Sequence, residues 1–370
     1  MSVTSPGNAN APVKPLHVGL VAGAHTLEDL GPVVGHLAVG LLDEPMYVSL
    51  VHPAGADVSR VPSPPVQMFP YPRSLLPFRT PRAAQAVPEA LRPVNLALLH
   101  ALDVGALDVT RHLAADRDLE YLAGVMSKDG TPTVGDERCR GLLAASEPIR
   151  QALLRVRGAP PDGIALLRPP VHRAGKATCF IDPNHVPAIV AAGQLSRFEP
   201  YAAVLEAFAR LRADQRDCAF FLLGSGPSER PLRRLAERLG LMGELTFVDR
   251  QSPEQIKGIL RAADVFVWPG PSQRVEIELL SAMAAGVPVL AAGAEVSDFI
   301  IPDETALAFQ TGDADGLAGK LAALLDDRAA ARSLAERALA LLRRNHSPAA
   351  AASRLVHIYR AIAAGKPLPV

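Results

Sequence analysis

The sequence has few cysteines, few aromatic residues and no excess of charge of either sign. Its three cysteines, Cys139, Cys179 and Cys218, are odd in number and widely spaced. They match neither a disulfide framework nor the ligand spacing of a metal site, so we expect free, buried or half-buried thiols in a reducing cytosol. The 38 basic and 38 acidic residues cancel. This balance argues against a nucleic-acid-binding protein, because such proteins usually carry a basic face.

Long apolar runs are also missing. No run approaches the roughly 20 residues that a membrane-spanning helix needs. Residues 1–15 are polar and rich in Ser, Asn, Pro and Gly, without the charged and apolar regions of a signal peptide, so we expect a disordered leader. The sequence therefore predicts a soluble, cytoplasmic protein without a transmembrane segment. Peripheral contact with a membrane through a local basic patch stays open.

The chain does contain a repeated alternation of short apolar runs and helical patterns. Apolar runs rich in β-branched residues, such as LHVGLVA at 16–22, are typical of buried parallel strands. A proline-dense stretch, 53–93, predicts loop with short helical pieces, and Ser146 before Pro148 predicts a capped helix start. The predicted strands are residues 16–22, 46–51, 96–99, 121–126, 188–192, 219–223, 245–248, 265–268 and 287–291. The predicted helices include residues 30–42, 202–211 and 278–285, the last closed by Gly286.

These repeated β-α-β units predict an α/β protein with parallel sheets that bind ligands beyond the carboxyl ends of their strands. A chain of 370 residues exceeds what one core usually holds, so two domains are expected. Proline-rich residues 168–187 are the predicted linker. We expect the leader at residues 1–15, an N-terminal domain at 16–172, a C-terminal domain at 173–346 and a final helix at 347–370.

Several segments of the C-terminal half resemble, in order and at matching spacing, the GT4-type glycosyltransferases (glycosyl transferases group 1). They are AGQLS at 192–196, LLGSGP at 222–227, ADVFVWP at 263–269, AMAAGVPV at 282–289 and PDETAL at 302–307. The N-terminal half is similar at 31–38, 100–103 and 168–171. The resemblance implies a GT-B fold, in which two Rossmann-like parallel-sheet domains face a central cleft and the final helix, at 347–370, crosses back to the N-terminal domain. It also implies transfer of a sugar from a UDP- or GDP-linked donor, with retention and without a metal or other cofactor.

The residues with which this family binds its donor are altered here. The family's phosphate-binding Arg and Lys fall on Gln194 and Glu199, and its two sugar- and ribose-binding glutamates fall on Gln273 and Ser281. Its histidine falls on Lys128. Because charge-assisted hydrogen bonds contribute roughly 1.5–3 kcal/mol each, these changes could cost several kcal/mol of phosphate affinity.

Neighbouring residues could compensate. Arg197 and Arg274 could reach a phosphate, and Glu278 shares a helical face with Ser281. The predicted donor-binding residues are therefore Gly193, Gln194, Arg197, Gly224, Gly226, Gln273, Arg274, Glu278 and Ser281. The predicted catalytic residues are His100, Asp103 and Lys128.

Each of these assignments has a structural alternative. The glycines could simply form tight strand-to-helix turns, the two arginines could be solvated loop charges, and His100 could be a half-buried histidine with its partners satisfied. Three functions consequently stay open: an active glycosyltransferase with a glycan, lipid or small-molecule acceptor, a catalytically inactive GT-B protein that binds a glycan or partner, and another GT-B chemistry such as nucleotide-sugar epimerisation. A net positive donor pocket would favour the first.

Overall fold

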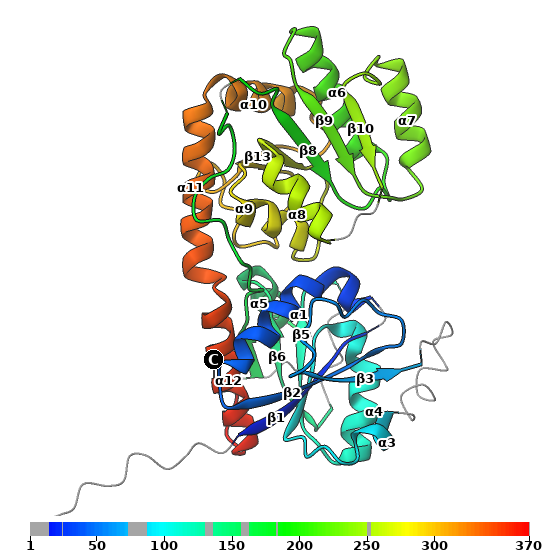
Figure 1. The fold of residues 1–370 in the computed structure, drawn as a ribbon, viewed down its shortest axis with the longest axis vertical. Coiled ribbons are helices and arrows are strands. Elements are labelled where there is room, and N and C mark those ends of the chain that lie inside the picture. The colour runs from blue at the N-terminus through cyan, green and yellow to red at the C-terminus, as the bar shows by residue number, and fades with distance from the viewer. Residues whose placement is uncertain are drawn as a thin grey trace, which may run out of the picture. The chain divides into compact units, whose positions relative to one another are not determined.

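The structure, a computed structural model, describes residues 15–23, 25–72, 87–129, 136–156, 163–182, 184–249 and 253–369. The chain forms two compact units. The first unit comprises residues 1–124, 135–142 and 352–369, and the second comprises 125–134, 143–351 and Val370. Two parallel sheets with helices packed along them make up the architecture, which confirms the predicted α/β class (Figure 1).

The N-terminal sheet has seven strands in the order β3-β2-β1-β4-β5-β6-β7. Its central strands are buried almost throughout, as expected for parallel strands covered on both faces. β1 pairs with β2 and β4 in parallel, with Leu20 opposite Leu50 and His100. The strands are β1 (Leu16–Val21), β2 (Met46–Pro53), β3 (Gln67–Tyr71), β4 (Leu98–Ala101), β5 (Tyr121–Val125), β6 (Cys139–Ala144) and β7 (Ile164–Leu166).

The C-terminal sheet has six strands in the order β10-β9-β8-β11-β12-β13. Its core joins the central strands to helices α6, α10 and α11 through fully buried residues such as Val267, Phe208, Leu321 and Leu334. Phe208 and Phe220 stack with ring centroids 4.2 Å apart. The strands are β8 (Ala188–Ala192), β9 (Ala219–Leu223), β10 (Leu245–Val248), β11 (Val265–Trp268), β12 (Val289–Ala291) and β13 (Leu307–Ala308).

Helices connect most of the strands. They are α1 (Thr26–Leu42), α3 (Val87–Leu91), α4 (Leu107–Arg117), α5 (Glu147–Leu154), α6 (Glu199–Ala213), α7 (Glu229–Arg238), α8 (Pro253–Ala262), α9 (Ile277–Ala285), α10 (Ala314–Asp326), α11 (Arg328–Asn345) and α12 (Pro348–Ala363), with a short 3₁₀ turn η2 (Val104–Ala106). Within the described ranges, none of them is both long and apolar enough to cross a bilayer. All three cysteines are free, and Cys179 and Cys218 are buried, which confirms the predicted thiols.

The prediction for residues 53–93 was wrong in part. Residues 67–71 form β3, an outer strand that pairs with β2 over Ser49–Pro53. Pro70 tolerates this position because an outer strand leaves one row of backbone groups unpaired. Residues 73–86 lie outside the described part. β4 also begins two residues later than predicted, and β6, β7, α4 and α11 were not predicted.

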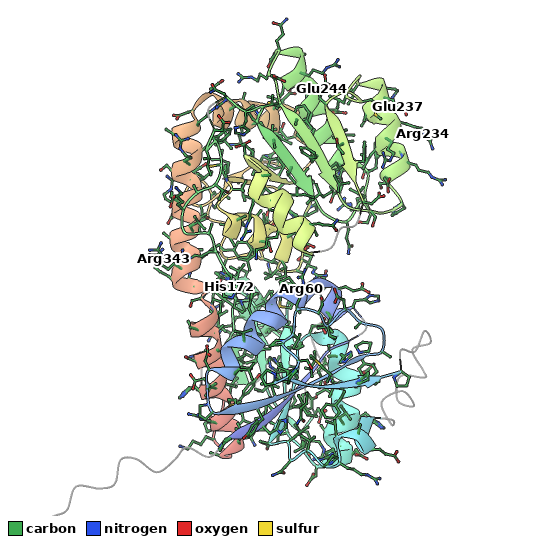
Figure 2. All side chains as sticks on the ribbon, in the orientation of Figure 1. Arg60, His172, Arg234, Glu237, Glu244 and Arg343 are labelled. Carbon is green, nitrogen blue, oxygen red and sulfur yellow. The ribbon has the colours of Figure 1, made fainter. Side chains whose placement is uncertain are left out.

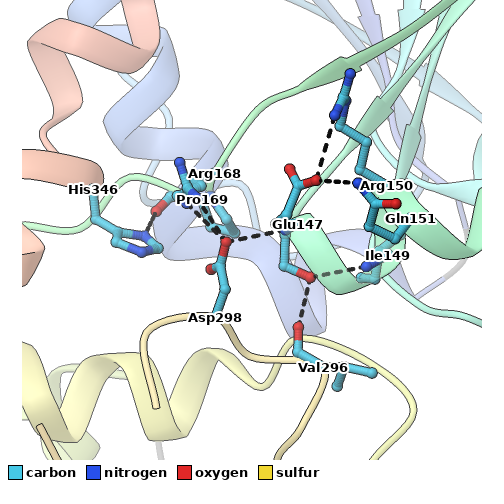
Figure 3. Close-up of polar contacts among 10 residues, drawn as sticks. Glu147, Ile149, Arg150, Gln151, Arg168, Pro169, Val296, Asp298 and His346 are labelled. Atoms are coloured by element: carbon cyan, nitrogen blue, oxygen red, sulfur yellow. Dashed lines mark hydrogen bonds and ion pairs between the residues drawn. The ribbon is translucent and has the colours of Figure 1, made fainter. Parts of the chain in front are cut away.

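Local capping signals were more reliable. Gly286 ends α9 in the left-handed conformation, with φ of 87°, as the sequence predicted. Ser146 caps α5 by accepting a hydrogen bond from Ile149 N at 3.4 Å. Its hydroxyl also donates to the carbonyl oxygen of Val296 at 2.5 Å, which attaches the start of α5 to the loop after β12 (Figure 3).

Asp298 makes a second attachment at the same place. Its Oδ2 accepts hydrogen bonds from Glu147 N at 3.0 Å and from Arg168 Nε at 3.0 Å. His346 Nδ1 bonds the carbonyl oxygen of the adjacent Pro169 at 2.7 Å (Figure 3). The proline-rich residues 168–187 are without helix or strand where the structure describes them. Within the second unit they are therefore held by side chains instead of by a sheet.

We predict that Ser146→Ala lowers the free energy of unfolding by about 1–3 kcal/mol, because the change removes a helix cap and leaves the Val296 carbonyl without its partner. Ser228 is the control, since it precedes α7, is also buried, and makes no side-chain cap hydrogen bond. Urea denaturation followed by circular dichroism measures both variants. An equal effect of Ser228→Ala would contradict the assigned role of Ser146.

Candidate functional site

The strand order places a candidate site at one edge of the C-terminal sheet. β8 lies between β9 and β11, and the chain leaves β8 toward one side and returns through β11 on the other. In open parallel sheets of this kind, ligands bind beyond the carboxyl ends of the strands at such a switch point. The loops after β8, β9 and β11 carry most of the predicted donor residues. The structure therefore brings the loops that carry these residues to one edge of the sheet, within the second unit.

Glycines let the loops after β8 and β9 pack backbone against backbone. Gly193 and Gly224 have φ of 144° and 139°, which side-chain-bearing residues rarely adopt. A Cβ on Gly224 would collide with the carbonyl oxygen of Gly193, and one on Gly226 with that of Leu195. Leu195 N also donates to the carbonyl oxygen of Ser225 at 3.1 Å. These glycines are therefore required by the fold itself.

The same packing consumes backbone donors. Gly193 N donates to the carbonyl oxygen of Leu223 and Gly224 N to that of Val248, each at 3.1 Å. A diphosphate held by the backbone of these glycines would need free N–H groups. In this structure those two N–H groups are already bonded inside the protein.

The loop after β8 exposes two side chains, although its backbone packs against the loop after β9. Gln194 and Arg197 are both exposed. Among the residues that the structure describes, Arg197 has neither an ion pair nor a hydrogen-bond partner. Glu199 opens the first turn of α6 two residues later. The loop thus offers one cation beside one carboxylate.

The loop after β11 is joined to a segment from the other half of the sequence. Residues 126–128, after β5, pair antiparallel with residues 273–275. Lys128 N donates to the carbonyl oxygen of Gln273 at 2.8 Å, and Ser127 Oγ donates to the same oxygen at 3.0 Å. The side chains of Lys128 and Gln273 are both exposed. Two predicted site residues that are far apart in sequence are thereby neighbours within the second unit.

Helix α9 brings carboxylates to this edge. Glu276 is its N-cap residue and Glu278 lies in its first turn. Ser272 Oγ lies 2.5 Å from Glu276 Oε1. Ser281 is one turn further along and half-buried. Arg274, Glu276 and Glu278 all have interaction partners in the protein.

Tyr201 was not predicted as part of this site. Its phenol oxygen and the ring of Trp268 lie where a Cβ on Gly193 would be, and Tyr201 is 5% exposed. Burial, followed by the nearby Glu276 and Glu278 carboxylates, raises the pKa of Tyr201 above its usual value. The phenol consequently stays protonated at neutral pH. Because this residue is one of several buried residues of α6, nothing in the local sequence distinguishes it from an ordinary core tyrosine.

The predicted catalytic residues His100 and Asp103 both make hydrogen bonds within the first unit. His100 is only 2% exposed, and its Nδ1 lies 2.7 Å from the hydroxyl of Tyr359 on α12. Asp103 Oδ1 accepts hydrogen bonds from Thr26 Oγ1 at 2.8 Å and from Ala106 N at 3.1 Å, so it caps η2. The structural alternative for His100 therefore fits this arrangement. Both residues belong to the first unit, whereas Lys128 belongs to the second.

The charges of the C-terminal edge are close to balanced. Arg197, Arg274 and Lys128 oppose Glu199, Glu276 and Glu278, so these six side chains do not form the net positive pocket that would favour an active glycosyltransferase. Across the described ranges, the acidic, histidine and cysteine side chains form no group of three that could hold a metal ion. Phosphate binding at this edge would thus depend on the two cations without an ion-pair partner in the described structure, Arg197 and Lys128.

Comparison with known proteins finds a family match over the part of the chain that forms this edge. Residues 186–327 match the model of the family described as Glycosyl transferases group 1. The D-inositol 3-phosphate glycosyltransferase of Corynebacterium efficiens is 32% identical over 186 residues, which are 48% of this chain and 43% of that protein. The chain spans about half the length of the curated relatives it matches.

Solved structures extend the likeness to the whole fold. A glycosyltransferase from Rickettsia africae superposes with a TM-score of 0.74 at 16% identity, covering 95% of this chain and 99% of that one. Anabaena Alr3699/HepE, determined in complex with UDP and glucose, gives a TM-score of 0.72 at 13% identity, covering 94% and 100%. At these identities the likeness concerns the fold.

The fold is the GT-B architecture found in these glycosyltransferases, as the sequence motifs predicted. More particularly, residues 186–327 match the model of the glycosyl transferases group 1 family, so the resemblance stated from the motifs is confirmed over this part of the chain.

We predict that Gly224→Ala lowers the free energy of unfolding by at least about 2 kcal/mol, because a Cβ there collides with backbone and the conformation disfavours L-residues. Gly319 in α10 is the control. A Cβ on it meets nothing, so Gly319→Ala should stabilise the protein by about 0.5–1 kcal/mol. Chemical denaturation measures the unfolding free energy of both variants. Equal effects would contradict the requirement for glycine at position 224.

We also predict a pH effect that originates at His100. Burial lowers its pKa to about 4 from an ordinary 6.5, so the folded protein keeps the ring neutral while the unfolded chain binds a proton below pH 6.5. Its contribution to stability is therefore present above pH 6.5 and is lost as the pH falls toward 4. Between pH 7 and 5 the loss should be about 2 kcal/mol.

His100→Gln tests this effect, because the amide can still bond Tyr359 and does not titrate. The difference between wild type and variant in unfolding free energy, measured by denaturation at several pH values, isolates His100 from the other histidines. A wild-type and variant pair with the same pH dependence would show that His100 is solvated.

Proposed function

We propose that this protein transfers a sugar from a nucleotide-sugar donor to the hydroxyl of a glycan, lipid or small-molecule acceptor, and that the donor binds at the carboxyl edge of the C-terminal sheet. The observation that carries the proposal is the convergence of the loops after β8 and β11 at the switch point of a glycosyl transferases group 1 domain. The UDP-bound state of the structurally similar Anabaena protein supports a nucleotide ligand.

In this proposal the diphosphate is held by side chains more than by backbone. The family's Arg and Lys are absent at positions 194 and 199, and two glycine N–H groups are bonded within the protein. Arg197 and Lys128 are exposed cations without an ion-pair partner among the described residues. We assign both to the diphosphate, where charge-assisted hydrogen bonds are strongest.

The sugar and ribose hydroxyls are assigned to residues on the β11 side. Gln273 is exposed, and Ser281 lies on the same helix as Glu278. A neutral amide and a hydroxyl still bond hydroxyl groups, although they lack the negative charge that the family's glutamates supply. Arg274 contributes positive charge to this side. We therefore expect weaker donor binding than a complete family site would give.

The proposed reaction breaks the bond between the anomeric carbon and the diphosphate oxygen. The acceptor oxygen then bonds that carbon, and its proton leaves with the diphosphate. Arg197 and Lys128 stabilise the negative charge that develops on the departing diphosphate. We propose that this occurs without a metal ion and with retention at the anomeric carbon. His100 bonds Tyr359 of α12, and Asp103 caps η2. We therefore assign both residues the role of positioning these elements within the first unit.

We predict that UDP or GDP and their sugar conjugates stabilise the protein in a thermal-shift titration. At a concentration 100 times Kd, one ligand should add about 2.7 kcal/mol to the stability of the native state. Arg197→Ala and Lys128→Ala should each weaken binding by about tenfold or more, because each loses a charge-assisted bond. The titration is run with and without magnesium, and equal shifts are expected.

Arg234→Ala is the matched control, since Arg234 is exposed on α7 (Figure 2). It should leave the shift unchanged. Stabilisation by none of these nucleotides, in a protein whose circular dichroism shows it folded, would contradict the proposed donor site and favour the catalytically inactive alternative. A shift that requires magnesium would contradict the metal independence alone.

A further inference from the structure

A basic hollow on the second unit is separate from the proposed donor site. It has a volume of about 330 Å³ and is lined by Glu304, Arg337, Ala340, Arg343 and Arg344. The last four belong to the C-terminal part of α11, and Glu304 belongs to the turn that precedes β13. None of them was predicted to bind the donor.

The spacing along α11 explains why these side chains share one face. Ala340 follows Arg337 by three positions, and Arg343 and Arg344 follow Ala340 by three and four. Side chains at such intervals lie above one another on a helix. Ala340 is exposed and small, so it leaves open space between the arginines that precede and follow it. Most of the hollow is therefore lined by residues of one face of α11, and the turn at Glu304 closes one side of it.

Arg337 is fixed in place. Its Nε donates to the carbonyl oxygen of Glu304 at 2.7 Å, its Nη2 to that of Asp303 at 3.3 Å, and its Nη1 to Ser333 Oγ at 2.9 Å. A guanidinium has five N–H donors, so some remain after these three bonds. A cation held in this way loses little conformational entropy when it binds a ligand.

Arg343 and Arg344 are exposed (Figure 2 labels Arg343). Neither guanidinium makes an ion pair or a hydrogen bond with any residue in the described part of the chain. Both lie in the last turn of α11, where a cation interacts favourably with the helix dipole. That interaction alone would account for two arginines at a helix end. It does not account for a third, fixed arginine in the same hollow.

The lining carries three positive charges and one negative charge, from Glu304. This imbalance favours an anion. Guanidinium groups bind phosphate through paired N–H donors, which makes arginine the preferred residue for phosphate recognition. A volume of about 330 Å³ lies at the lower end of the range for ligand pockets, so it suits a phosphate group with few attached atoms.

We propose that the hollow formed by Arg337, Arg343 and Arg344 is a second anion site, which binds a phosphate group. Arg337 presents fixed donors, and the two unpaired arginines close over the phosphate from the end of α11. Glu304 weakens binding through its like charge. The phosphate group belongs either to a small soluble ester or to a lipid headgroup, and the experiment separates the two sources.

The first arm titrates the full-length protein with inorganic pyrophosphate by isothermal titration calorimetry at low ionic strength. Excess UDP is present, so that a working donor site is already occupied. The Arg343→Ala/Arg344→Ala double variant should weaken binding by about tenfold or more, because two charge-assisted contacts are lost. Glu304→Gln should tighten it severalfold.

The second arm measures co-sedimentation with vesicles of phosphatidylglycerol and phosphatidylcholine, compared with phosphatidylcholine alone. The control in both arms is Arg234→Ala/Arg238→Ala, which removes two exposed arginines from α7, one of them in its last turn. It has the same change in net charge as the test variant and should behave as wild type.

Pyrophosphate binding that depends on Arg343 and Arg344 supports the site with a soluble ester as its ligand, and vesicle binding with the same dependence supports it with a lipid headgroup. The proposal is overturned if the wild type binds neither probe, or if the double variant and its control lose binding equally. The result is independent of the donor site. If UDP fails to bind, the dependence on Arg343 and Arg344 is still measured.

Discussion

The C-terminal sheet depends on one contact between two stretches of backbone. The carbonyl oxygen of Gly193 occupies the space that a Cβ on Gly224 would need. This contact allows the loops after β8 and β9 to bond one another, with Leu195 N donating to the carbonyl oxygen of Ser225 and Ser228 N to that of Leu195. Because these loops are fixed by their own backbone, they provide a rigid border to the switch point. The exposed side chains of Gln194 and Arg197 are attached to that border.

The site is completed by segments that the sequence keeps far apart. The pairing of residues 126–128 with 273–275 places Lys128 next to Gln273. It also positions the loop that leads into α9, whose first turn carries Glu278. Under the proposed function, Lys128 from the segment after β5 supplies positive charge that the β8 loop lacks at positions 194 and 199.

Local signals predicted part of this arrangement. The cap at Ser146, the C-cap at Gly286 and the β8, β9 and β11 segments depend on residues close in sequence, and the structure confirms them. The burial of His100 depends on Tyr359, 259 positions away, and no periodicity reports such a contact. α11 was missed because it follows α10 after Asp327 alone, without a Pro or Gly to mark the boundary. The roles of the altered donor residues stay predictions.

The division between buried backbone and exposed side chains at the donor edge has a consequence for how the protein can change. Positions 193, 224 and 226 accept almost no side chain without disturbing the fold. Positions 194, 197 and 273 are exposed, and their substitution leaves the two loops intact. Selection, or an engineer, can thus exchange the side chains presented at this edge at little cost in folding, while the backbone frame stays constant. In the proposed donor site, this separation makes new specificities accessible through side-chain changes alone.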